Sequence, residues 1–152
     1  MKVYIGTDHA GFELKEALKN YLGELGYEVS DKGAFRFDPG DDYPDFIKPV
    51  AEMVVDTPLS FGIVLGKSGQ GEAMCANRFE GIRCAVFYGG DLEIVKLERL
   101  HNNANILSLG AQFLTPEIAK EAVKIFLETK FSEEERHVRR LAKIDNFNLW
   151  QK

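Results

Sequence analysis

Asp8 and His9 stand together where a strand-like apolar run, residues 2–7, gives way to a helical pattern. A neighbouring carboxylate and imidazole can transfer a proton or bind an anion. An aspartate that caps a helix beside an exposed histidine explains the same pair without any chemistry. The functional interpretation is favoured if this segment lies at the carboxyl end of a strand.

A second candidate is the glycine-rich segment that runs from Gly66 to Glu72, with the sequence Gly-Lys-Ser-Gly-Gln-Gly-Glu. It is not an ATP-binding P-loop, because Phe61 stands where that motif needs its first glycine. It is not a dinucleotide-binding motif either, because Met74 stands at the third glycine position. A glycine-rich turn that leads into a helix does direct backbone N–H groups toward an oxyanion.

Glu72, at the start of that helix, admits two interpretations. An acid in the first turn stabilises the helix dipole by about 0.3–1 kcal/mol. The same carboxylate beside an anion hole is a general base. Removing a proton from a carbon next to a carbonyl requires both a base and donors that hold the resulting enediolate.

Two groups nearer the C-terminus are candidates for acid chemistry and anion binding. His101 ends a helical pattern, a position that favours the protonated imidazole, whereas the asparagines that follow are typical of any helix C-terminus. Arg136 and Arg140 stand four residues apart and could hold one phosphate between them. An ordinary solvated helix face explains the two arginines equally well.

The elements that must position these residues follow from the apolar pattern. Short runs rich in β-branched and aromatic residues predict five strands, at 2–7, 27–31, 61–65, 83–87 and 106–109. Helices are predicted over 14–25, from Pro44 to about 55, after Leu65, over roughly 91–101, from Thr115-Pro116, and from a Ser132/Glu135 capping box to about 145.

This alternation predicts a three-layer αβα Rossmann-like sandwich, with a five-stranded parallel sheet and a C-terminal helix, as a single domain over residues 1–152. Ligands of such sheets bind at the carboxyl ends of the strands. The segments that follow residues 7, 31, 65, 87 and 109 are therefore the ones in which a site is expected.

Composition excludes several classes of protein. Nineteen Lys and Arg against 24 Asp and Glu give a net charge of −5, which does not suit binding to duplex nucleic acid. The apolar runs are far shorter than the roughly 20 residues that span a bilayer, so no membrane partner is expected. No apolar leader follows Met1, which predicts a cytoplasmic protein. Cys75 and Cys84 lack the spacing of a disulfide framework or a metal site.

Together the motifs resemble those of one family, the type B ribose-5-phosphate isomerases and the related galactose-6-phosphate isomerase subunits. The matching motifs are Asp8-His9-Ala10-Gly11, Asp42-Tyr43-Pro44-Asp45, Gly66-x-Ser68-Gly69-x-Gly71-Glu72, Ala76-Asn77-Arg78, Gly81-Ile82-Arg83, His101-Asn102-x-Ala104-Asn105 and Arg136-His137-x-x-Arg140. The resemblance implies an aldose–ketose isomerase that acts on a sugar phosphate, foremost ribose 5-phosphate, through a cis-enediolate. It also implies no metal or organic cofactor, and a homodimer or tetramer whose active sites use both subunits.

The resemblance further implies which residues act on the substrate carbons. Glu72 is the base for C1/C2 proton transfer, as in the members that carry a Glu after this turn. Other members use a Cys at the position that is Gly66 here. Ser68, with the backbone of Gly69 and Gly71, forms the anion hole and the proton relay between O1 and O2.

The remaining implied roles belong to the sugar ring and the phosphate. Asp8 and His101 assist ring opening, Tyr43 lines the sugar site and Asn102 holds a substrate oxygen. Gly66 and Lys67 belong to the substrate-binding turn. The implied phosphate ligands are His9, Arg136 and Arg140, with His137 adjacent.

Two departures from the family pattern leave other substrates open. Gln112 stands where many members carry an Arg that binds the phosphate, and a charge-assisted hydrogen bond is about twice as strong as a neutral one. Lys67 replaces a residue that is usually small, and could return a positive charge. A different phosphorylated sugar, such as a hexose 6-phosphate, or a free sugar is therefore an alternative substrate. A non-catalytic ligand-binding subunit is a third hypothesis, since this fold hosts many functions.

Overall fold

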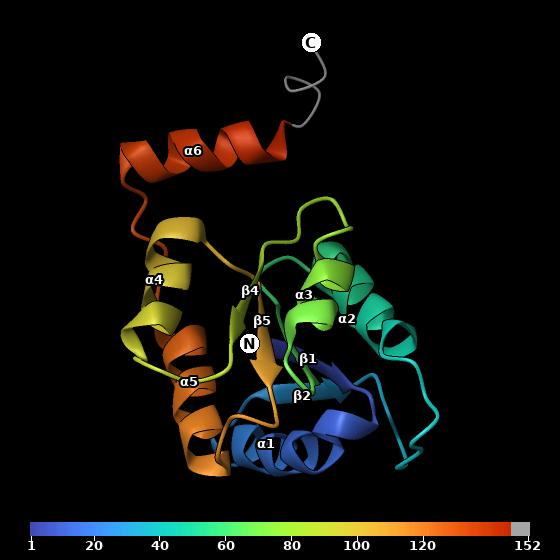
Figure 1. The fold of residues 1–152 in the computed structure, drawn as a ribbon. Coiled ribbons are helices and arrows are strands. Elements are labelled where there is room, and N and C mark those ends of the chain that lie inside the picture. Colours follow the sequence, from blue (N-terminus) through green and yellow to red (C-terminus); the bar gives the residue numbers. More distant parts are fainter. Residues whose placement is uncertain (147–152) are drawn as a thin grey trace.

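The computed structural model describes residues 1–146 and contains one five-stranded sheet in the order β2-β1-β3-β5-β4 (Figure 1). The strands are β1 (Lys2–Thr7), β2 (Glu28–Asp31), β3 (Phe61–Gly66), β4 (Cys84–Phe87) and β5 (Ile106–Gly110). Every pairing is parallel. The five predicted strands are confirmed, each within one residue of its predicted bounds.

Helices connect the strands and cover both faces of the sheet. They are the short 3-10 helix η1 (His9–Gly11), α1 (Phe12–Glu24), α2 (Pro44–Asp56), α3 (Gln70–Ala76), α4 (Glu93–Asn102), α5 (Pro116–Glu128) and α6 (Glu135–Asp145). Helices α1, α4 and α5 pack on one face, and α2 and α3 on the other (Figure 1). The predicted three-layer α/β/α sandwich is confirmed.

The core consists of two apolar clusters, one on each face of the sheet. Successive residues of β1 point into different clusters: Val3 and Ile5 pack beneath α1 and α5, and Tyr4 packs beneath α2. All three are at most 1% exposed. Because both faces are covered, the strand has no polar side, which explains the continuous apolar runs in the sequence.

The strand order reverses between β1 and β3, and this positions the candidate residues. Thr7 pairs with Leu65 in the register of these strands, and the Thr7 hydroxyl donates to the Leu65 carbonyl at 2.9 Å. The segments that follow the two strands therefore leave the sheet side by side. Such a reversal point is where open α/β sheets bind ligands.

The predicted capping box at the last helix is wrong. Helix α6 begins at Glu135, and the residue before it makes no side-chain cap. The Ser132 hydroxyl instead accepts a hydrogen bond from the Glu134 N–H at 3.4 Å, which makes a local turn before the helix. Figure 1 shows α6 lying outside the layers, beyond one end of α4, with which it packs.

The predicted single domain extends to residue 152, and 147–152 lie outside the described residues, so its full extent stays a prediction. Among the helices that the structure describes, none has the length and apolar content needed to cross a bilayer.

Candidate active site

The Glu72 carboxylate lies directly over the end of β3. Its side chain is in the first turn of α3, and the residue is 5% exposed. A Cβ atom placed on Gly66 would stand 1.8 Å from Glu72 Oε1. The carboxylate thus fills the space that any side chain at position 66 would need, so the glycine is a requirement of this arrangement.

The surroundings of Glu72 favour its protonated form. Burial raises the pKa of the Glu72 carboxyl, a hydrogen bond with its own backbone N–H partly offsets that rise, and the negative charge of Asp8 adds to it. A general base is most effective when its pKa approaches the working pH. Burial and a like-charged neighbour are the two means by which active sites shift a carboxyl in that direction.

The turn before Glu72 is held in place by the neighbouring strand β5. Gly69 has a φ of +77°, and an added Cβ would stand 2.9 Å from the Leu109 carbonyl carbon, so only glycine fits there. The Ser108 hydroxyl, fully buried on β5, donates to the Gly69 carbonyl. Sequence analysis missed Ser108, although a lone polar residue inside the apolar run 106–109 is a usable signal.

Tyr43 reaches the same turn from the start of α2. A Cβ atom on Gly71 would lie 3.0 Å from both Cζ and Oη of Tyr43. The phenol ring therefore rests against the backbone of Gly71. The structure brings Tyr43 and the glycine-rich turn together, and the role of Tyr43 in lining a sugar site stays a prediction of the resemblance.

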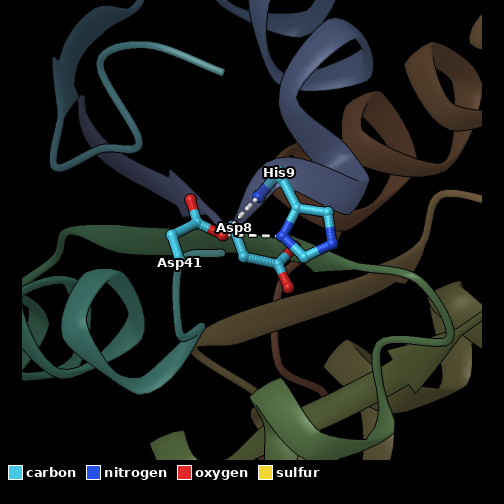
Figure 2. Close-up of side chains that lie close together, drawn as sticks. All are labelled: Asp8, His9 and Asp41. Atoms are coloured by element: carbon cyan, nitrogen blue, oxygen red, sulfur yellow. Dashed lines mark hydrogen bonds and ion pairs between the residues drawn. The ribbon is translucent and has the colours of Figure 1, made fainter. Parts of the chain in front are cut away.

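Asp8, His9 and Asp41 form a cluster at the end of β1 (Figure 2). Asp8 is 7% exposed and caps η1, because its Oδ1 accepts from the Ala10 N–H at 3.0 Å. Asp41 Oδ1 lies 2.7 Å from His9 Nδ1 and accepts from the His9 backbone N–H at 3.0 Å. The capping interpretation of Asp8 is thus confirmed as a structural role, and Asp41 is a member that sequence analysis missed.

The charge of His9 is set mainly by this contact. The hydrogen bond to Asp41 raises the pKa of the His9 imidazole, burial opposes the rise, and the charges of Asp8 and Asp38 support it. One ligand atom from each of Asp8, His9 and Asp41 lies within 4.8 Å of the others, a spacing that a cation could also use. Asp41 Oδ1 contacts both the backbone N–H and the ring Nδ1 of His9, so the cluster is held together by hydrogen bonds.

A separate cluster forms where α6 meets the end of α4. The rings of His101 and His137 stack, with centroids 4.3 Å apart and planes 11° from parallel. His137 is 4% exposed, and its Nε2 has no hydrogen-bond partner among the described residues. Burial lowers the pKa of His137, and the neighbouring His101, Arg136 and Arg140 lower it further. Arg136 is exposed and pairs with Glu134 at 2.9 Å.

The cluster around Asp8 and the stacked pair of His101 and His137 lie at opposite ends of the strands. Asp8 and Gly66 are at the carboxyl ends of β1 and β3, whereas His101 and Asn102 end α4, which returns the chain to the amino end of β5. A strand of five or six residues separates these edges by about 15–20 Å. The structure therefore does not bring Glu72 and His101 together within one chain.

Gln112 and Lys67, which bear on the choice of substrate, are neighbours in space. The Gln112 N–H donates to the Lys67 carbonyl at 3.1 Å, and both residues are exposed. They lie at the carboxyl edge of the sheet, beside the turn that carries Glu72. Gln112, which replaces the expected arginine, and the additional Lys67 thus lie next to each other beside the glycine-rich turn.

The chain is an open α/β protein with a buried carboxylate on a glycine-rich turn. That turn lies at the carboxyl ends of the strands, where proteins of this class bind small ligands. The model of the Ribose/Galactose Isomerase family matches residues 3–144. The chain belongs to that family.

Known relatives agree in sequence and in structure. Ribose-5-phosphate isomerase B of Mycobacterium tuberculosis is 43% identical over 141 residues, which cover 93% of this chain and 86% of the relative. The structure of a ribose 5-phosphate isomerase from Thermotoga maritima is 43% identical, covers 95% of this chain and 97% of that one, and has a TM-score of 0.88. The ribose-5-phosphate isomerase B of Mycoplasma genitalium, solved with bound ribulose 5-phosphate, is 33% identical, covers 97% and 96%, and has a TM-score of 0.91.

Proposed function

We propose that this chain is a cofactor-independent aldose–ketose isomerase that interconverts ribose 5-phosphate and ribulose 5-phosphate. The observation that carries the proposal is the buried Glu72 carboxylate, seated over Gly66 beside a glycine-rich turn. The relatives named ribose-5-phosphate isomerase B support the reaction, and the bound ribulose 5-phosphate of one of them supports the substrate.

In this proposal Glu72 moves the proton between the two reacting carbons. Its carboxylate removes the proton from C2 of the open-chain aldose, and the C–H electron pair forms the C1–C2 double bond while the carbonyl electrons pass to O1. The backbone N–H groups of the turn stabilise the negative oxygen, and the Ser68 hydroxyl takes the proton from O2 while it donates its own to O1. Glu72 then returns its proton to C1, which completes the ketose.

Ring opening and phosphate binding require further groups, and a single chain does not place these groups near Glu72. We propose a homodimer or tetramer in which a second copy supplies His101, Asn102, Arg136, His137 and Arg140 to the site around Glu72. Asp8 and the second copy's His101 open the sugar ring. The arginines and His137 join His9 at the phosphate. A cytoplasmic location stays a prediction of the sequence.

The test is a comparison of substrates on the purified chain. Initial rates with ribose 5-phosphate, a hexose 6-phosphate and free ribose should favour ribose 5-phosphate by kcat/KM. Preference for another sugar would keep the isomerase chemistry and change the substrate, an outcome that the neutral Gln112 makes worth measuring. Absence of turnover with all three sugars would contradict the proposal and favour a ligand-binding subunit.

A further inference from the structure

We infer that Asp41 is a positioning residue that fixes the His9 imidazole and stabilises its positive charge, which offsets the missing cation at Gln112. This inference rests on the proposed function for the identity of the ligand, a sugar phosphate. It adds a residue that neither the motifs nor the expected phosphate ligands include.

Asp41 determines which atom of His9 is available to a ligand. Oδ1 of Asp41 accepts from the His9 backbone N–H at 3.0 Å and lies 2.7 Å from Nδ1 of the ring. Figure 2 shows the other ring nitrogen on the side of the ring turned away from Asp41. With Nδ1–H donating to the carboxylate, Nε2 can donate to a phosphate oxygen only when the ring is protonated.

The contact between Asp41 and His9 is partly shielded from water. The Asp41 side chain is 9% exposed and that of His9 is 34% exposed. Asp41 Oδ2 is buried and has no hydrogen-bond partner among the described residues, so His9 provides the compensation for this carboxylate. Screening by water is weaker at such a site than at an exposed ion pair, whose contribution is small.

The acidic groups around His9 act in the same direction. Asp41 contributes through its hydrogen bond, and Asp8 and Asp38 contribute through their charges. The Phe37 ring meets the imidazole edge-on, with centroids 6.3 Å apart, and braces it from a side without charge. These surroundings favour the protonated form of His9, and Asp41 both orients the ring through its hydrogen bonds and raises the pKa of the ring.

The segments that carry His9 and Gln112 border one groove. Ala10 and Ala111, the neighbours of these two residues in sequence, both line a groove of about 270 Å³ at the carboxyl edge of the sheet. The family resemblance implies an arginine at position 112, and this chain has a neutral amide there. A protonated His9 on the neighbouring segment would offer a positive charge that Gln112 lacks.

The first test is a proton NMR titration of the imidazole groups in the full chain, in the presence of a chelator. The chain has three histidines, so the His9 signal is assigned with a His9→Gln variant. Asp41→Asn should lower the pKa of His9, because the hydrogen bond to Asp41 is the largest cause of its rise. Asp38→Asn removes a charge that acts on His9 without a hydrogen bond to it, and should shift the pKa less. Equal shifts in the two variants, or none in Asp41→Asn, would overturn the inference.

The second test separates phosphate binding from chemistry. Asp41→Asn should raise KM for ribose 5-phosphate about tenfold, because a charged hydrogen bond to the phosphate is weakened, with kcat little changed. The rise should be larger at pH 8 than at pH 6, and Gln112→Arg in the Asp41→Asn background should lower KM again. A fall in kcat at unchanged KM, or no recovery with the arginine, would contradict the role. If the wild-type chain lacks isomerase activity the proposed function fails, and the titration still decides whether Asp41 charges His9.

Discussion

The Glu72 carboxylate occupies the space that a side chain at position 66 would need, because its oxygen lies 1.8 Å from where a Cβ on Gly66 would stand. The family resemblance implies a catalytic base that is either a cysteine at position 66 or a glutamate at position 72. The geometry gives a steric reason for that choice, because the two side chains would occupy one volume. The residue at position 66 therefore determines whether Glu72 can occupy its place.

Gly66→Ala should remove activity with little loss of stability. The added methyl group meets the far end of the Glu72 side chain, which can move away, so the backbone is not forced to shift. The displaced carboxylate loses its position for proton transfer, and we expect kcat to fall by about 10²-fold or more. Gly23→Ala, in α1 with nothing within 4 Å of the added carbon, is the matched control and should keep full activity. Near-normal turnover of Gly66→Ala would contradict the placement of the base.

Two inactive variants should restore activity when their subunits exchange. Glu72 and His101 lie at opposite edges of the sheet in one chain, so a shared site takes them from different copies. A mixed dimer of Glu72→Gln and His101→Asn then contains one site with both changes and one with neither. Random exchange should recover about a quarter of wild-type activity. Mixtures as inactive as the separate variants, with exchange verified by mass spectrometry, would show that sites are not shared in this way.

The stacked pair of His101 and His137 should make the fold sensitive to acid. Burial lowers the pKa of His137 below its usual 6.5, so the unfolded chain binds a proton more readily than the folded one. Stability is then greatest above pH 6.5 and falls as the pH drops through the lowered value. Denaturant midpoints measured from pH 7.5 to pH 5 should fall more steeply in wild type than in His137→Phe. If the midpoints of wild type and His137→Phe fall equally with pH, His137 is not the source of the acid sensitivity.

Glu98 should make the fold less stable as the pH rises, which is the opposite of the effect of His137. This residue of α4 is 7% exposed, its Oε2 has no hydrogen-bond partner among the described residues, and burial raises its pKa to about 8. The folded chain therefore holds a proton that the unfolded chain releases near pH 4.5, and stability falls as the pH rises from about 4.5 to 8. Glu98→Gln should raise the free energy of unfolding at pH 8 by about 1–3 kcal/mol and change it little at pH 5. The exposed Glu80→Gln is the control, and an equal gain at both pH values would contradict the assignment.

Sequence patterns predicted the sheet because its strands are buried on both faces, so each appears as a short apolar run. The same patterns placed the turn before Glu72 at the carboxyl end of β3, whereas Tyr43 was assigned to the site only by the family resemblance. They missed Asp41, which lies in the irregular segment between β2 and α2, where no periodicity fixes what faces His9. The start of α6 was wrong because Ser132 satisfies its own turn instead of capping the helix.

The most direct test of the central claim is exchange of the substrate C2 proton with heavy water, followed by NMR under single-turnover conditions. Wild type should exchange the C2–H of ribose 5-phosphate at a rate comparable to isomerisation. Glu72→Gln removes the proton acceptor while keeping the size of the side chain, and should slow exchange by about 10²–10⁴-fold with the fold intact. Exchange at the wild-type rate in that variant would contradict the role of Glu72 as the base.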